Sequence, residues 1–132
     1  MDKKIAVIGI CLLFLGSPAQ AHHSFAAEFD AKKPVNLRGV VTRVEWINPH
    51  TWIHLDVRGP DGRLVKWMVE GGSPNALFRR GVTKASIPLG TEIVVDGYQA
   101  RSGTKRANGR DITFASGAKF SLGGGPDEGA PN

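Results

Sequence analysis

The chain has 132 residues, 41% of them hydrophobic, with 17 Lys or Arg, 12 Asp or Glu and a formal net charge of +5 at pH 7. This length suits one small domain that buries a core of its own. The single cysteine, Cys11, excludes an intramolecular disulfide and a metal site built from several thiolates. The mild positive charge is typical of a solvated surface and does not require an anionic partner.

Residues 1–21 have the pattern of a cleavable secretory signal peptide. Two lysines precede an apolar run from Ile5 to Leu15, and an A-x-A cleavage site ends at Ala21. The apolar run is shorter than the roughly 20 residues that a transmembrane helix needs. We therefore expect export to a bacterial periplasm and a mature chain that begins at His22, with no transmembrane segment.

The mature chain divides into three parts by composition. Residues 22–33 form an N-terminal segment, and residues 34–122 carry the apolar patterns of a folded domain. Residues 123–132 are rich in Gly and Pro and have no apolar periodicity, so we expect a disordered tail.

The pattern of the folded domain is mainly that of β-strands. The five predicted strands are Val35–Ile47, His50–Arg58, Arg63–Glu70, Glu92–Tyr98 and Asp111–Ala115. Gly39 lies inside the first strand, where a glycine marks a bulge or a bend. In the second strand one face is expected to carry Thr51, Ile53, Leu55 and Val57, and the other face His50, Trp52, His54 and Asp56.

One short helix is predicted between strands three and four. Ser73 is its N-cap, Pro74 takes the first helical position, Leu77 faces the core and Gly81 ends it. This order predicts a mainly β fold: a small five-stranded OB-like barrel with one short helix between strands three and four. The alternative is an open five-stranded sheet with one covering helix.

Three motifs stand out: HHSF at His22–Phe25, PVNLRGVV from Pro34, and EWINPH from Glu45 to His50. With them the chain resembles a family of small exported bacterial proteins described only as a domain of unknown function. The resemblance implies an exported OB-like domain in which these histidines are a family feature, and it implies no activity. The chain also resembles, more distantly, periplasmic OB-fold proteins linked to stress responses.

All four histidines of the chain fall in two places, His22-His23 and His50 with His54. If the signal is cleaved after Ala21, the α-amine and the ring of His22 can chelate one metal ion together. A third nitrogen from another histidine completes a site that suits copper, with zinc as the second choice.

Two residues four apart on a strand are about 13 Å apart at ~3.3 Å per residue, and His50 is the favoured third ligand because it lies at the turn. One ion therefore takes His50 or His54 but not both, and His23 and His54 are the alternates. Glu45 is expected to add a ligand oxygen or to hold a ring nitrogen behind the ligands. The other interpretation makes His22 and His23 a polar N-terminus and His50 a hydrogen-bonded cap of the turn.

The three tryptophans have different expected roles. Trp67 alternates with valines and belongs to the core, whereas Trp52 and Trp46 are candidates for a ligand-binding face. The alternative for Trp52 is that Phe25 or Phe29 covers it, which would also bring the N-terminus close to His50.

Other functions have little support in the sequence. The acids on the strands are isolated, and no base or orienting acid is evident near Ser24, so we expect no catalysis. The basic loop Arg101–Arg106 lacks interleaved aromatics, which with export argues against nucleic acid. The sequence therefore predicts a non-catalytic periplasmic binding protein for copper. The alternative is a metal-free interaction module for an envelope protein or a glycan.

Overall fold

The computed structural model describes residues 25–127. The predicted signal peptide, His22 and His23 lie outside these residues. Within them, no helix has both the length and the apolar character to cross a membrane.

The described part of the chain is mainly β, as predicted. Residues 25–28 form a helical turn ahead of the first strand. The strands are β1 (Phe29–Glu45), β2 (Trp52–Arg58), β3 (Leu64–Glu70), β4 (Glu92–Ala100), β5 (Arg106–Phe114) and β6 (Lys119–Ser121). The short helix α2 (Pro74–Arg79) and the 3-10 turn η1 (Lys84–Ser86) connect β3 to β4.

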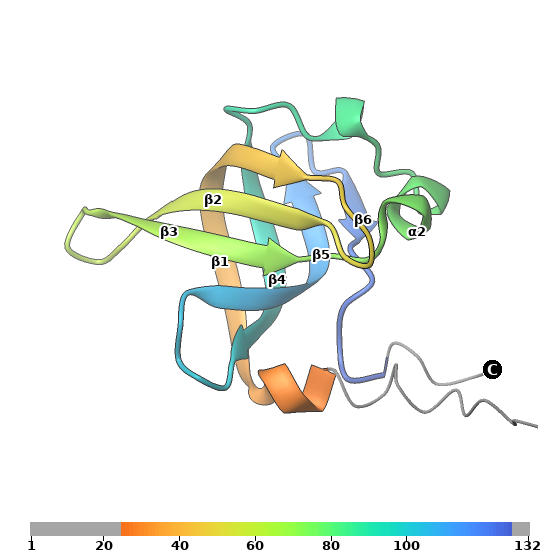
Figure 1. Ribbon diagram of the computed structural model, residues 1–132. Coiled ribbons are helices and arrows are strands. Elements are labelled where there is room, and N and C mark those ends of the chain that lie inside the picture. The colour runs from red at the N-terminus through yellow and green to blue at the C-terminus, as the bar shows by residue number, and fades with distance from the viewer. Residues whose placement is uncertain (1–24, 128–132) are drawn as a thin grey trace, which may run out of the picture.

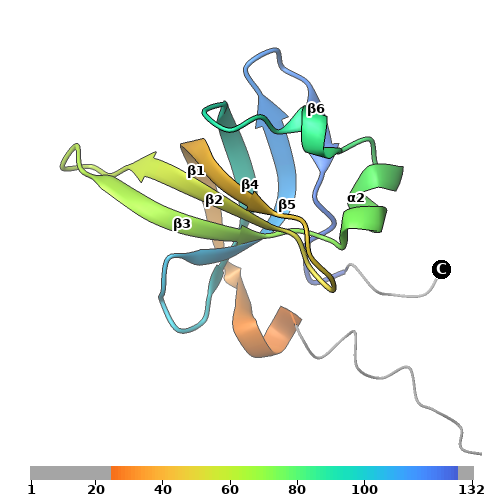
Figure 2. The same ribbon diagram turned by 45° about the horizontal axis from the view of Figure 1, so that its top comes forward.

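The strands form one sheet in the order β3-β2-β1-β4-β5-β6, and β3 also pairs with β5. That last pairing is parallel and joins Met68–Glu70 to Arg106–Asn108, whereas the other strand pairs are antiparallel. The sheet therefore curves into a ring, with α2 beside one end of it (Figures 1 and 2). The sixth strand, β6, adds to the five that the sequence predicted.

β1 is the longest strand of the ring, and its two halves pair with different neighbours. Its first half pairs with β4 and its second half with β2, and Gly39 lies opposite both Ile93 and Val57. A Cβ atom on Gly39 would lie 2.8 Å from the carbonyl oxygen of Asp56. The strand thus passes this crossing point only because residue 39 has no side chain.

The predicted helix has the predicted cap. The Ser73 hydroxyl accepts a hydrogen bond of 3.2 Å from the backbone N–H of Ala76, and Pro74 is the first helical residue. Leu77 is fully buried, whereas its neighbour Phe78 is 68% exposed. The helix therefore closes one end of the core through a single leucine.

The interior of the ring follows the predicted alternation. Thr51, Ile53 and Leu55 are buried, and the intervening His50, Trp52, His54 and Asp56 are partly exposed on the outside. Trp67 is a core residue, as predicted. The other large, fully buried side chains include Val69, Leu77, Val82, Val95, Ile112 and Leu122.

Several predicted boundaries differ from the structure, and the largest differences extend the ordered part of the chain. β1 begins at Phe29, inside the segment expected to precede the domain, and β5 begins at Arg106, inside the expected polar loop. Two glycines of the expected tail, Gly124 and Gly125, are buried, and the N–H of Gly125 donates to the Asn108 side-chain oxygen over 2.9 Å. Residues far away in the sequence hold these polar and glycine-rich stretches in place. The stretches themselves carry no local sequence pattern that predicts ordered structure.

Candidate functional site

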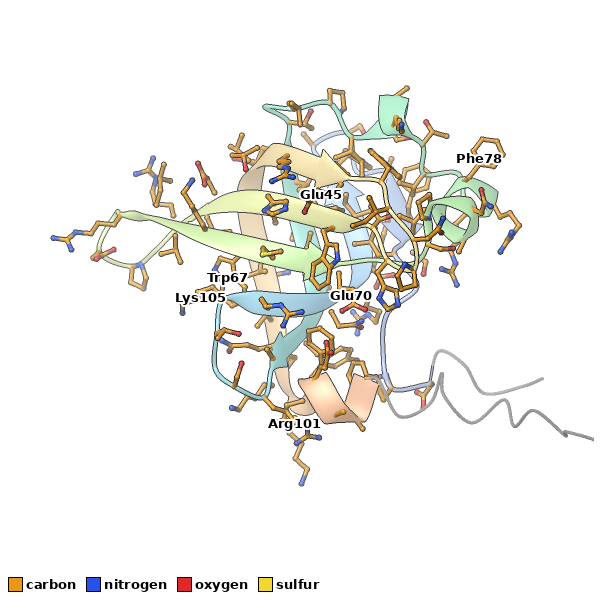
Figure 3. All side chains as sticks on the ribbon, in the orientation of Figure 1. Glu45, Trp67, Glu70, Phe78, Arg101 and Lys105 are labelled. Carbon is orange, nitrogen blue, oxygen red and sulfur yellow. The ribbon has the colours of Figure 1, made fainter. Side chains whose placement is uncertain are left out.

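The candidate site is the outer surface of β1, β2 and β3 with the start of β5, here called the β1–β3 face. Strand register aligns Arg43, His54, Met68 and Arg106 in one row across it. The neighbouring row consists of Glu45, Trp52, Glu70 and Asn108. Glu45 and Glu70 lie on the side of the sheet turned toward the viewer in Figure 3. A basic row thus runs beside a row that contains two acids.

The first histidine of this face, His54, pairs with Glu45. Its Nε2 atom lies 2.8 Å from Glu45 Oε2, and Arg43 Nη2 lies 2.5 Å from the other oxygen. The hydrogen bond from His54, together with Arg43, holds the pKa of the Glu45 carboxyl below its ordinary value, although partial burial opposes this. The Glu45 carboxyl group is therefore stabilised in its ionised form, and it engages the Nε2 atom of His54.

The second histidine, His50, pairs with Glu70. Its Nδ1 atom lies 2.8 Å from Glu70 Oε1, and the side chains are 41% and 9% exposed. Burial raises the pKa of the Glu70 carboxyl and the charge of Glu28 adds to this effect, while His50 and Arg106 oppose it. His50 is thus a half-exposed ring held by a buried acid.

The backbone around His50 is anchored by an extension of the β2–β3 pairing. The N–H of Thr51 donates to the Gly72 carbonyl over 3.0 Å, and the N–H of Gly71 donates to the Thr51 carbonyl over 2.8 Å. The preceding Asn48-Pro49 bond is cis. These bonds place the residue before Thr51 next to the end of β3, where Glu70 lies.

Arg106 connects this site to the N-terminal turn. Its guanidinium lies 5.1 Å from the centre of the Trp52 ring and 3.8 Å from a Glu28 oxygen. Arg101 anchors the turn, because its Nε donates to the Ala26 carbonyl and its N–H to the Glu28 carbonyl. Figure 3 shows Arg101 beside this turn, below Glu70. The described chain therefore begins next to the His50–Glu70 pair.

Each of the two acids pairs with one histidine. Glu45 was expected to add a ligand oxygen or to hold a ring nitrogen, and the ring nitrogen that it contacts is that of His54. His50 pairs with Glu70, an acid that appeared isolated. The hairpin register contained the signal for this contact. Counting back from the Gly59–Gly62 turn places Glu70 opposite Trp52, beside His50.

Trp52 is not covered by an aromatic ring of the N-terminal segment. The ring of Phe25 lies 5.9 Å from that of Phe29 and 5.6 Å from that of Tyr98, so this cluster packs on β4. The ring contacts of Phe25 and Phe29 differ from the expectation that one of them covers Trp52, because the turn before β1 and the first residue of β1 place both rings beside β4. Trp46 does not join Trp52 either, since it packs against the core and lines a hollow beside α2.

The predicted metal ligands are described only in part. Among residues 25–127 no group of three His, Cys, Asp or Glu side chains is arranged to hold a metal ion. His50 and His54 bind separate carboxylates. His22 and His23 lie outside the described residues, so the copper site stays a prediction.

Comparison with other proteins identifies a family but no function. No curated protein and no solved structure matches the chain significantly. A family model covers residues 10–109, from the expected signal peptide to the middle of β5. The chain belongs to a family of unknown function, DUF6152.

Proposed function

We propose that this chain is a non-catalytic, OB-like binding protein of the bacterial periplasm that binds copper through its N-terminal histidines. The OB-like assignment rests on the order of elements. β1 pairs with both β2 and β4, β3 pairs with β5 to close the ring, and the helix lies between β3 and β4. This is the arrangement expected of a five-stranded Greek-key barrel, with β6 as an addition.

The observation that carries the copper proposal is the His50–Glu70 pair. An ionised carboxylate only accepts hydrogen bonds, so the Nδ1 atom of a neutral His50 carries the proton that Glu70 accepts. The Nε2 atom then keeps its lone pair on a half-exposed ring. Metal-binding histidines are typically oriented by such a carboxylate, which fixes the tautomer and raises the basicity of the ring.

The proposed site requires the N-terminal ligands to reach this ring. Arg106, which lies over the Trp52 ring, is 3.8 Å from a Glu28 oxygen, so the turn at residues 25–28 lies beside the β1–β3 face. His22 is three residues before Phe25, which limits the distance between their Cα atoms to about 10 Å. The proposed site combines the α-amine and ring of His22 with His50, with His23 and His54 as alternates and zinc as the less favoured metal.

The test is copper binding by calorimetry on protein that begins at His22. One extra residue ahead of His22 removes the free amine from the chelate and is expected to abolish tight binding. His50→Ala should weaken binding by at least about tenfold, and Glu70→Gln by about tenfold to a hundredfold.

His54→Ala is the matched control for the copper experiment. It removes another histidine that also pairs with a glutamate, and it should leave affinity within about twofold. Equal binding by the native and the extended N-terminus would refute the site. So would an effect of His54→Ala as large as that of His50→Ala.

A second candidate function is a metal-free interaction module for an envelope protein or a glycan. It is favoured by Trp52, which lies half-buried at the centre of the β1–β3 face with Arg106 against its ring. An aromatic ring flanked by charged groups suits a sugar. Under this alternative, Trp52→Ala abolishes binding of cell-wall muropeptides, His50→Ala does not, and copper binds weakly.

A further inference from the structure

A cavity of about 400 Å³ opens on the β1–β3 face near the β4–β5 turn. The cations Arg43, Lys66 and Lys105 line it together with His54 and Trp67, and no acid is among its described lining residues. Figure 3 shows Lys105 and Trp67 side by side below β3. The cavity is thus a basic hollow with an aromatic wall.

The strand pairing explains why a hollow forms here. The β1–β2 register shifts between Val41 and Arg43, so Thr42 bulges out of the ladder and lines the cavity. β3 pairs with β5 only from Met68 onward, so Lys66 and Trp67 have no β5 partner. The β4–β5 turn, which carries Lys105, covers this part of β3 instead of a strand.

The three cations of the cavity are available to a ligand. Arg43 pairs with Glu45, and Lys66 Nζ lies 3.6 Å from Asp56 Oδ1, with the cationic side chains 65% and 88% exposed. The acids of these pairs, Glu45 and Asp56, are 25% and 24% exposed, but each pair opens to solvent through its cation, so a ligand can compete for the cation. Lys105 pairs with no carboxylate of residues 25–127; its ammonium lies 5.2 Å from the centre of the Trp67 ring.

We propose that this cavity binds a small organic anion that carries two or more phosphate or carboxylate groups. The ammonium groups of Lys66 and Lys105 contact one anionic group, and the Arg43 guanidinium binds another in a two-pronged manner. Met68 provides apolar surface for the carbon skeleton, and the largely buried Trp67 lies beneath Lys105 at the base of the cavity. His50 and Glu70 are not among the lining residues, so this proposal does not depend on the copper site.

The experiment uses pyrophosphate and citrate as probes, titrated by calorimetry at low salt into metal-free protein. Chelating resin removes metal from the buffer, so that neither probe binds through a bound ion. We expect saturable binding of one anion per chain and a shift of the Trp67 indole N–H signal in NMR spectra. Lys105→Gln and Lys66→Gln should each weaken binding by at least about fivefold, since each removes a charge-assisted contact.

Lys84→Gln is the matched control, because it removes the same charge from an exposed lysine of η1 outside the cavity. It should change affinity by less than about twofold.

Pyrophosphate binding alone assigns a phosphate ligand, and citrate binding alone assigns a carboxylate ligand. An equal loss in Lys84→Gln would reduce the site to non-specific charge attraction and overturn the proposal. Failure of both probes to saturate by about 10 mM would also overturn it.

Discussion

The two histidine–glutamate pairs of the β1–β3 face have the same nitrogen–oxygen distance of 2.8 Å, but the pKa values of their carboxyl groups are shifted in opposite directions. The pKa of Glu45 is lowered chiefly by its hydrogen bond from His54, and that of Glu70 is raised chiefly by burial. Glu45 lies on the open part of the sheet, whereas β5 and the N-terminal turn surround Glu70. A histidine partner alone therefore does not determine the acidity of a carboxyl group.

The difference also separates the two histidines as candidate ligands. His54 uses Nε2 for Glu45 and is the less exposed of the two, with 22% of its side chain accessible against 41% for His50. His50 uses Nδ1, so the outer nitrogen of its ring points away from its carboxylate. We therefore place the proposed copper site at His50 and the proposed anion cavity at His54.

The largest predicted effect comes from separating β5 from β3, the contact that buries Glu70 of the His50–Glu70 pair. A Cβ atom on Gly109 would lie 2.7 Å from side-chain atoms of both Leu122 and Val69 and 3.2 Å from the Glu70 carbonyl oxygen. Gly109→Ala should lower the free energy of unfolding by about 2 kcal/mol, measured by urea denaturation, because β5 must move away from β3. By carboxyl NMR titration, the pKa of Glu70 should fall toward its ordinary value while that of Glu45 stays unchanged.

Gly71→Ala is the control for this substitution. Gly71 follows Glu70 directly, but a Cβ atom there would come no closer than 3.6 Å to any neighbour. This variant should change the free energy of unfolding by less than about 0.5 kcal/mol. Comparable losses in the two variants would show that close packing at Gly109 does not keep Glu70 buried.

A smaller effect is predicted for Arg106→Ala. The substitution removes the cation over Trp52 and leaves Glu28 and Glu70 without the charge that lies near both. We expect a loss of about 1 kcal/mol in the free energy of unfolding and a further rise in the Glu70 pKa. Arg43→Ala, which breaks an exposed pair, should cost less than about 0.5 kcal/mol and let the Glu45 pKa rise. A larger loss of stability in Arg43→Ala than in Arg106→Ala would contradict the conclusion that the His50–Glu70 pair is the more buried of the two.

The smallest effects concern the pH dependence of stability, where the two glutamates have opposite signs. The lowered pKa of Glu45 adds stability above its ordinary value of 4.5, and this stability is lost as pH falls through the folded-state pKa. The raised pKa of Glu70 adds stability at low pH that is lost as pH rises from 4.5 through the folded-state value.

Unfolding free energies between about pH 3 and pH 7 test this opposition. Glu45→Gln should reduce the loss of stability on the acid side, and Glu70→Gln should reduce the loss as pH rises above 4.5. If both substitutions changed the slope with the same sign, burial would not be the dominant effect at Glu70.

Local patterns in the sequence determined much of the secondary structure. The alternation from Thr51 to Asp56 reports which residues of β2 face the core, since successive side chains of a strand point to opposite faces. Ser73 and Pro74 specify the start of α2, because a cap and a first-turn proline act within one helical turn. Trp67 could be assigned to the core from its alternation with the neighbouring valines, and Gly39 marked the point where β1 changes partner.

Tertiary structure alone decided which of these residues meet. The polar Arg106–Asn108 stretch becomes a strand because β3 and β4 supply its backbone partners, and no property of its own side chains predicts this. The same pairing buries Glu70 and thereby raises its pKa. Burial and charge contacts depend on residues far apart in the sequence, so the roles of His50 and His54 follow from the register of the strands and the closure of the ring.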